Sequence, residues 1–283
     1  MTVELSVVIA AHNAAGTLAD QIQALREQAS ADVEIIVVDN ASTDGTAAIV
    51  GSLQDGSGVL RLEHEPLRGA SAARNHGVSR ARGRMLAFCD ADDIVGPEWV
   101  AGVLGGLADS PVVTGPLDVH SLNEPAFADS RGLGWTRRLE DFRGLFPVAH
   151  SGNFAIRRDV FEALGGFDVT RPIGEDVDLS YRLWCAGHRI AFEPRLELRY
   201  RYPTTLGALW RQGFSHGEFA ARFERQLRRD GHPVEAVQGG ARLRRLAWMV
   251  RHLPYLVTPR HRPRWIWVLA TEAGSVAALL RRG

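Results

Sequence analysis

The feature that most constrains the fold is an alternation of short, apolar, β-branched runs with stretches of helical periodicity over the N-terminal part of the chain. Residues 5–10 form a continuous run typical of a strand buried on both faces, and residues 17–28 follow with Leu18, Ile22 and Leu25 at helical spacing. The same pattern predicts strands at 34–38, 59–63, 84–89 and 112–115 and helices at 45–53, 71–82 and 97–107. This order predicts an α/β fold with a mostly parallel sheet and helices on both faces.

Charge is distributed unevenly along the 283 residues, although the net charge is zero. Residues 1–179 carry 26 acidic residues and 14 arginines, whereas residues 180–283 carry 7 acidic residues and 19 arginines. The sequence contains no lysine, which excludes a lysine Schiff base and a P-loop lysine. Since 45% of the residues are hydrophobic, we expect a folded chain with a sizeable core.

The two cysteines, Cys89 and Cys185, show no metal-binding spacing, so we expect a reducing, cytoplasmic environment. The N-terminus lacks a basic region, and Glu4 interrupts its apolar residues, so it is interpreted as a first strand and not as a signal peptide. No uncharged apolar stretch reaches 18 residues, and we therefore expect no membrane span.

The second half of the chain is less regular. Residues 116–147 are polar, with scattered Gly and Pro, and are predicted to be a flexible, irregular loop region. The elements expected after it are a strand at 152–156, helices at 160–164 and 177–186, two short extended pieces within 193–202, and a long helix at 206–227.

Three carboxylates in four residues, Asp90, Asp92 and Asp93, follow the predicted strand 84–89. Close carboxylates repel one another, and a hard divalent cation such as Mg²⁺ or Mn²⁺ with oxygen ligands relieves the repulsion. The alternative is a solvated acidic turn that caps the following helix.

Asp39 ends another buried strand, where a carboxylate can accept hydrogen bonds from a ribose or a base. The alternative is turn chemistry, because Asn40, Ser42, Asp44 and Gly45 all favour turns. Further along, residues 68–77 place small side chains and Arg74 at a helix N-terminus, which suits a diphosphate or, alternatively, an ordinary close-packed helix.

Glu175, Asp176 and Asp178 open a predicted helix within residues 174–187. Carboxylates at a helix N-terminus are stabilised by the helix dipole, so simple capping is one interpretation. The functional interpretation is a general base directed at an acceptor hydroxyl.

In their order and spacing, these segments resemble the family 2 glycosyltransferases, which have the GT-A fold. The resemblance covers roughly residues 4–215. It is carried by SVVIAAHN, EIIVVDNASTDGT, RGASAARNHG, MLAFCDADD, SGNFAIRRDVFEALGGFD and GEDVDLSYRLWCAG. It implies inverting transfer of a sugar from a nucleoside-diphosphate sugar to a sugar, lipid-linked or small-molecule acceptor, in polysaccharide, glycolipid or natural-product glycan synthesis.

The resemblance also implies roles for individual residues. Those assigned to the nucleotide sugar are Ala10, His12, Asn13, Asp39, Arg74 and Asp90. Asp90 and Asp92 match the DxD motif that holds a divalent metal, Mn²⁺ or Mg²⁺, with Asp93 assisting. Asp176 matches the catalytic base of inverting members, and Glu175 beside it orients that base or the acceptor.

The first motif and one late position depart from the family pattern. The first motif usually reads Pro-Thr-Tyr-Asn, and this chain has Ala-Ala-His-Asn at residues 10–13. Many members have a metal-binding His in a late strand, and Tyr200 stands at that position here. Because a neutral tyrosine is a poor divalent ligand, metal binding is expected to depend on the carboxylates, the diphosphate and water.

The expected organisation has three parts: residues 1–115 as the nucleotide-sugar half, 116–230 as the acceptor and catalytic-base half of the same domain, and 231–283 as a helical C-terminal extension. In that extension, apolar positions form a helical stripe beside arginines. The stripe comprises Leu243, Leu246, Ala247, Val250 and Leu253, and the arginines are Arg242, Arg244, Arg245 and Arg251. The extension is expected to contact a membrane surface peripherally, pack back on the catalytic domain or form a homodimer.

Three other functions predict different sequence features. A two-carboxylate hydrolase would need a second acid for its leaving group. A nucleotidyltransferase of related fold would lack the Glu-Asp helix, and a non-catalytic sugar-nucleotide-binding protein would not need Asp90, Asp92 and Asp176 together. No nucleic-acid-binding signature is present, so no nucleic-acid partner is expected.

Overall fold

The computed structural model describes residues 3–131, 138–232, 234 and 237–281. The chain forms two compact units. Unit 1 comprises Met1–Asp118 and Trp135–Tyr200, and unit 2 comprises Val119–Gly134 and Arg201–Gly283. The division predicted at residues 115 and 230 separates the chain by expected function, into nucleotide-sugar, acceptor and C-terminal parts, and it stays a prediction.

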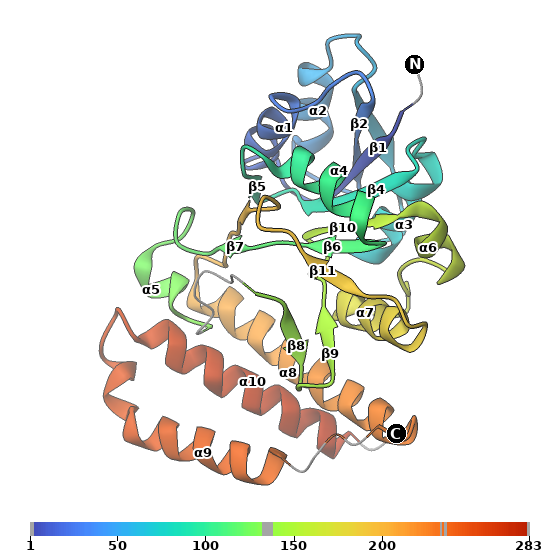
Figure 1. Cartoon of the computed structure of the whole chain (residues 1–283). Helices are drawn as coiled ribbons and strands as arrows, with labels where there is room; N and C mark the ends of the chain where they lie inside the picture. The colour runs from blue at the N-terminus through green and yellow to red at the C-terminus, as the bar shows by residue number, and fades with distance from the viewer. Residues whose placement is uncertain (1–2, 132–137, 233, 235–236, 282–283) are drawn as a thin grey trace. The chain divides into compact units, whose positions relative to one another are not determined.

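Unit 1 is built on a seven-stranded sheet with the order β11-β6-β10-β4-β1-β2-β3 (Figure 1). The strands are β1 (Leu5–Ala11), β2 (Val33–Asp39), β3 (Leu60–His64), β4 (Met85–Asp90), β6 (Val112–Thr114), β10 (Asn153–Arg157) and β11 (Ile190–Phe192). β10 runs antiparallel to both of its neighbours, and the other pairings in the sheet are parallel. The predicted mostly parallel sheet is therefore confirmed.

Helices cover both faces of this sheet (Figure 1). They are α1 (Leu18–Arg26), α2 (Thr46–Leu53), α3 (Ala70–Arg80), α4 (Trp99–Asp109), α6 (Arg158–Ala163) and α7 (Glu175–Cys185). α3 packs very closely on β1, and the absence of a side chain at Gly77 permits this approach. A Cβ on Gly77 would lie 2.4 Å from a methyl group of Val8. On the opposite face, the indole of Trp99 in α4 donates a hydrogen bond of 2.8 Å to Asn153 in β10.

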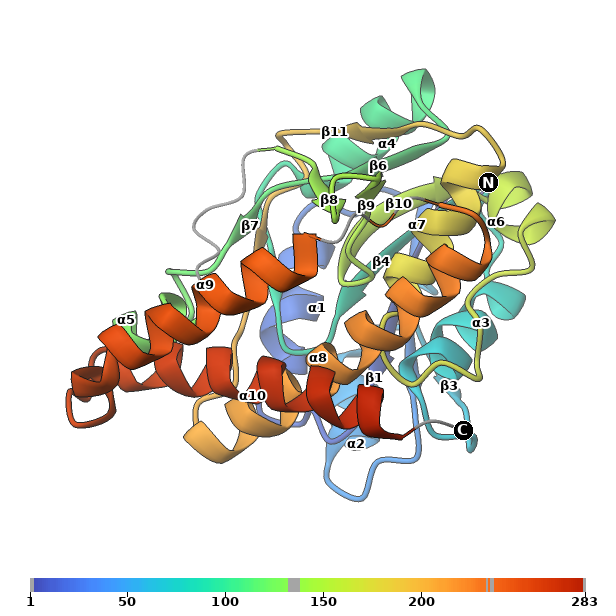
Figure 2. The same ribbon diagram turned by 90° about the horizontal axis from the view of Figure 1, so that it is seen from below.

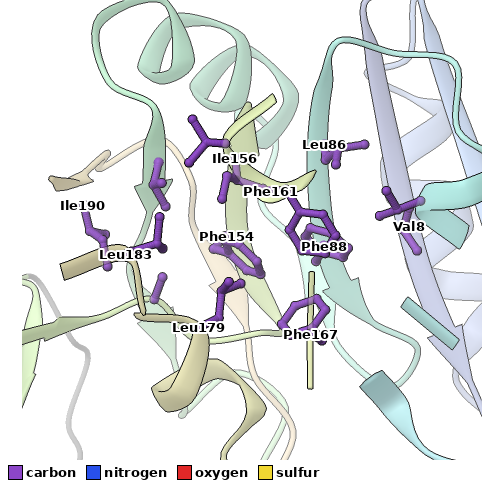
Figure 3. Close-up of a cluster of buried hydrophobic side chains, with 14 of the residues drawn as sticks. Val8, Leu86, Phe88, Phe154, Ile156, Phe161, Phe167, Leu179, Leu183 and Ile190 are labelled. Atoms are coloured by element: carbon purple, nitrogen blue, oxygen red, sulfur yellow. The ribbon is translucent and has the colours of Figure 1, made fainter. Parts of the chain in front are cut away.

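The core between the sheet and α3, α6 and α7 is rich in phenylalanine (Figure 3). Phe88 of β4 stacks on Phe154 of β10 with ring centroids 4.9 Å apart, and Phe167 meets Phe88 edge-on. Truncating a buried phenylalanine to alanine typically costs about 3–5 kcal/mol. This cluster therefore fixes β10 beside β4, which matters for the position of the residues that precede β10.

The region predicted to be irregular, residues 116–147, contains short regular elements, and the prediction is wrong for these. They are β7 (Leu117–Asp118), α5 (Pro125–Ala128), β8 (Glu140–Phe142) and β9 (Phe146–Val148). Residues 132–137 of this region lie outside the described residues. β7 joins a three-stranded sheet with β5 (Ile94–Val95) and β12 (Leu198–Arg199), and β8 pairs with β9. Strands of two or three residues are too short to show a period in the sequence.

Unit 2 is helical, with α8 (Leu206–Arg229), α9 (Val237–Arg251), the 3₁₀ turn η1 (Leu253–Leu256) and α10 (Arg262–Leu280). α8 and α10 lie side by side (Figure 2). Glycines bring them into backbone contact, since a Cβ on Gly217 would lie 2.0 Å from the carbonyl oxygen of Thr271, and one on Gly274 would lie 1.9 Å from that of Phe214. Within the described part of the chain, no helix combines the length and apolar character needed to cross a membrane.

Candidate active site

The carboxyl ends of three neighbouring parallel strands meet at one edge of the sheet in unit 1 (Figure 1). In the register of these strands, Ala11 of β1 lies beside Asp39 of β2, and Ala10 lies beside Asp90 of β4. Three of the predicted nucleotide-sugar residues, Ala10, Asp39 and Asp90, are therefore level with one another. Ligands of open α/β sheets bind at this edge.

Asp39 has a buried carboxylate that is only partly satisfied. Its Oδ2 lies 3.4 Å from Nδ1 of His64. Its Oδ1 is buried and accepts no hydrogen bond from any residue that the structure describes. A buried acceptor without a donor costs about 1–3 kcal/mol of folding free energy. A hydroxyl or N–H group of a ligand that donates to Oδ1 would remove this cost.

His12 and Asn13 follow β1 and are both exposed. The imidazole of His12 donates from Nδ1 to the carbonyl oxygen of Asn40 at 2.8 Å, which fixes the ring at the end of the strand. Asn13 has a left-handed backbone (φ +52°), a conformation that asparagine tolerates, and its side-chain oxygen accepts from the backbone N–H of Thr43. These contacts tie the turn after β1 to the turn after β2.

Arg74 is the central charge of the site. It lies on α3, its side chain is 3% exposed, and its two terminal nitrogens donate to different carboxylates. Nη2 lies 2.5 Å from Oδ1 of Asp90, and Nη1 lies 2.8 Å from Oε1 of Glu175, at the start of α7. Burial alone would lower the pKa of Arg74, but the two carboxylates outweigh it and raise that pKa, so the guanidinium stays charged.

The position of Asp90 is also set by Gly152, in the turn before β10. A Cβ on Gly152 would lie 2.5 Å from Oδ2 of Asp90, which is closer than real Cβ contacts come. Only glycine therefore fits here without moving the carboxylate. Asp90 is the end of β4, where one oxygen is held by Arg74 and the other lies against this glycine.

The remaining acidic residues of the DxD segment differ in exposure. Asp92 is exposed, and Asp93 is buried. Among the residues described, no group of three or more His, Cys, Asp or Glu side chains is arranged to hold a metal. The carboxylates of Asp90 and Asp92 alone would leave a divalent metal short of ligands, and Mg²⁺ commonly completes its coordination with substrate phosphates and water.

Tyr200 directly follows β12 of the small sheet, and β5 of that sheet directly follows the acidic segment. Arg199, the last residue of β12, pairs with Ile94, the first residue of β5, and Ile94 directly follows Asp93. The backbone N–H of Tyr200 donates to the carbonyl oxygen of Asp118 at 2.8 Å. The chain thus has a tyrosine at the position next to the acidic segment where the resemblance predicts a histidine.

Glu175 and Asp176 occupy the first turn of α7, which begins after Gly174 in a left-handed conformation (φ +78°). Asp176 accepts hydrogen bonds at Oδ1 from the N–H of Val177 (2.8 Å) and at Oδ2 from that of Ser151 (3.4 Å). Glu175 is nearly buried and accepts from the hydroxyl of Ser151 at 3.0 Å. Burial and the charge of Asp176 raise the pKa of Glu175, against the opposing effect of Arg74.

Three further residues of this cluster were not predicted from the sequence: Ser151, His150 and Glu140. Nδ1 of His150 lies 3.9 Å from Oδ2 of Asp176, and its Nε2 lies 3.3 Å from Oε2 of Glu140 in β8. The neighbouring imidazole of His150 lowers the pKa of Glu140 below its ordinary value, against the opposing effect of burial. Ser151 is the first residue of SGNF, which begins one of the segments that carry the resemblance. That segment was the signal in the sequence that could have identified Ser151. Nothing local in the sequence marks Glu140.

The sheet topology, the helices on both faces and the acidic strand ends define an α/β protein of the GT-A type. The family described as "Glycosyl transferase family 2" matches residues 6–165, and the one described as "Glycosyl transferase family group 2" matches residues 86–279. The chain therefore belongs to glycosyl transferase family 2. This confirms the resemblance stated from the sequence motifs.

Relatives of known role share about a quarter to a third of their aligned residues with this chain. The succinoglycan biosynthesis protein ExoO of Rhizobium meliloti is 31% identical over 212 residues, covering 68% of this chain and 58% of that protein. The poly-β-1,6-N-acetyl-D-glucosamine synthase of Staphylococcus aureus is 24% identical, covering 74% of this chain and 52% of that protein. The chain thus spans little more than half the length of these relatives.

Solved structures share the fold. The mannosyltransferase PcManGT from Pyrobaculum calidifontis, in complex with GDP-Man and Mn²⁺, is similar with a TM-score of 0.71 at 19% identity, covering 100% of this chain and 89% of that one. S. aureus TarS 1–349 in complex with UDP-GlcNAc gives a TM-score of 0.56 at 14% identity, covering 98% of this chain and 92% of that one. At these identities the likeness concerns the fold.

Proposed function

We propose that the chain transfers a sugar from a nucleoside-diphosphate sugar to a hydroxyl of a glycan or lipid-linked acceptor, with inversion at the anomeric carbon. The observation that carries this proposal is the bridge from Asp90 through Arg74 to Glu175. It joins the strand end suited to a nucleotide to the helix end suited to a base in one hydrogen-bonded cluster. The roles in the names of the relatives, in succinoglycan and poly-N-acetylglucosamine synthesis, support a glycan product.

The donor nucleotide would bind at the ends of β1 and β2. Asp39 offers its buried Oδ1 to a ribose hydroxyl or a base N–H, and the exposed ring of His12 offers an apolar face to the base. Asn13 holds the turn beneath it through Thr43. The neighbours that bind GDP-Man and UDP-GlcNAc support a nucleotide-sugar donor without choosing between the bases.

The diphosphate would lie against Asp90 and Asp92, which would hold Mn²⁺ or Mg²⁺ together with it. When bound, such a metal neutralises negative charge on the departing nucleoside diphosphate. In this arrangement Arg74 orients Asp90 and Glu175, because both of its terminal nitrogens are already engaged by them. The predicted direct contact of Arg74 with the nucleotide stays a prediction.

Asp176 would act as the general base. The N–H groups of Val177 and Ser151 and the N-terminus of α7 stabilise negative charge on its carboxylate. As the acceptor oxygen attacks the anomeric carbon, its proton passes to Asp176 and the bond from that carbon to the diphosphate oxygen breaks. A nucleoside diphosphate leaves as a stable anion, so no second carboxylic acid is needed, in contrast to a glycoside hydrolase.

The test is the release of free nucleoside diphosphate from a panel of UDP-, GDP- and dTDP-sugars, with Mn²⁺, Mg²⁺ or EDTA, in the presence and absence of a glycan acceptor. We expect acceptor-dependent release of nucleoside diphosphate. A nucleotidyltransferase would exchange pyrophosphate instead, and a binding protein would release nothing. Either result would overturn the proposal.

The panel is repeated with Asp176→Asn, which keeps the size of the side chain and removes its basicity. We expect a loss of turnover of about 10²-fold or more with donor binding, measured by calorimetry, unchanged. Asp159→Asn is the matched control, since Asp159 also lies in the first turn of a helix, α6, but is exposed and outside the cluster. Full turnover by the Asp176 variant would remove this residue from the role of base.

A further inference from the structure

The outer face of α9 presents an apolar stripe formed by Leu243, Leu246 and Val250, which Leu253 at the start of η1 continues. The exposed fractions of these four side chains are 70%, 44%, 69% and 50%, and Val257, just after η1, is 78% exposed. Leaving several large aliphatic side chains in water on one helix face is unfavourable, and such faces mark interaction surfaces. The exposures confirm that the predicted stripe exists and faces outward.

The opposite face of α9 is fixed to α10 within unit 2. Arg245 forms an ion pair with Glu272 of α10, and the indole N–H of Trp265 donates to the carbonyl oxygen of Met249 at 3.1 Å. Arg245, predicted from the sequence to flank the stripe, thus faces inward and holds α9 in place. The stripe is consequently held on a supported helix, with its orientation set by the packing of unit 2.

The charges around the stripe are positive. Arg244 and Arg251 are exposed on α9 beside it. Arg260, in the segment before α10, and Arg264, in the first turn of α10, are also exposed. Between residues 237 and 281 the sequence contains one acidic residue, Glu272, which is 7% exposed and paired with Arg245. These exposed arginines form no ion pair with any residue that the structure describes. An apolar stripe edged by such arginines complements a surface that is anionic outside and apolar beneath.

We propose that the α9 stripe seats unit 2 on a membrane surface that contains anionic phospholipids, with the aliphatic side chains in the interfacial region and the arginines on the headgroups. A second copy of the chain fits the face less well, because two copies would bring Arg244 and Arg251 against one another. The proposal concerns an interaction surface and does not depend on the transfer chemistry proposed above.

The test is flotation of the full chain with vesicles of phosphatidylcholine alone and of phosphatidylcholine with 30% phosphatidylglycerol. We expect binding to the anionic vesicles that falls as salt rises, and little binding to the neutral ones. Each of Arg244→Gln and Arg251→Gln should weaken binding about fivefold. Val250→Glu should weaken it about tenfold or more, because it places a charge in the apolar stripe.

The matched control is Val169→Glu, which introduces the same change at another exposed valine, in unit 1, and should leave vesicle binding unchanged. Far-UV circular dichroism confirms that each variant is folded. Absence of binding to anionic vesicles, or equal binding by the Val250 variant and the unaltered chain, would overturn the proposal. A dimer seen by light scattering that Val250→Glu dissociates, without vesicle binding, would assign the stripe to a second copy instead.

Discussion

Removal of the Arg74 charge is the perturbation whose consequence follows most directly from the structure. Arg74→Met keeps most of the side-chain volume and leaves the carboxylates of Asp90 and Glu175 without their shared partner. Their side chains are 29% and 12% exposed, so water can compensate Asp90 in part and Glu175 very little. Breaking a buried ion pair costs about 3–5 kcal/mol, and we expect the lower end of this range because Asp90 is partly hydrated.

A loss of this size should lower the melting temperature of a chain of this length by roughly 6–12 °C. The assay is urea and thermal unfolding followed by circular dichroism, with Arg84→Met as the control. Arg84 also pairs with a glutamate, Glu4, but its side chain is 74% exposed, and exposed pairs contribute little.

A double-mutant cycle separates the ion pair from other effects of the substitution. Glu175→Gln removes the charge that Arg74 neutralises, so the double variant should be more stable than the sum of the two single changes predicts, by about 1–3 kcal/mol. A cost below about 1 kcal/mol for Arg74→Met, or strict additivity in the cycle, would refute the view that this arginine joins the two carboxylates.

Two further predictions concern Gly152 and Glu34. Gly152→Ala should lower kcat/KM for sugar transfer by about 10²-fold with the fold retained, because its Cβ would displace Asp90, whereas Gly51→Ala in α2, with nothing within 4 Å, should have no such effect. Burial alone would raise the pKa of Glu34, but hydrogen bonds from Ser6, Arg82 and Arg61 outweigh burial and lower it. The stability that Glu34 contributes is therefore present above the ordinary glutamate pKa and lost as the pH falls through the lowered value. Urea unfolding at pH 7 and at pH 4 should show that Glu34→Gln reduces both stability at pH 7 and its loss on acidification.

The sequence was sufficient for the main architecture of unit 1. Residues 5–10 and 34–38 are long enough, and contain enough β-branched residues, to predict β1 and β2. The polar residues that follow these two runs, His12 and Asp39, indicate the edge of the sheet at which a ligand is expected. These features are local, since a buried strand and the residue that ends it are neighbours in the chain. Short pairings such as β5 with β12 left no such signal.

The connections within the site could not be predicted in the same way. Arg74 and Glu175 are 101 residues apart in the chain, and their ion pair follows from the packing of α3 and α7 against one core on the same face of the sheet. Ser151 and His150 precede β10, whereas the ligand-binding residues of a parallel sheet are expected after the ends of its strands. β10 is antiparallel to β4, so the residues before it arrive at the same edge that the neighbouring strands reach with their carboxyl ends.

The glycine contacts between α8 and α10 limit how unit 2 can vary. Glycine inside a helix costs about 0.5–1 kcal/mol relative to alanine, and here it permits a backbone separation that any side chain would prevent. Replacing Gly217 or Gly274 alone would force the two helices apart, so divergence at one position requires a matched shift in the whole pair. We therefore expect α8 and α10 to behave as a single rigid block in any chimera, and exchanges with related chains should take both helices together.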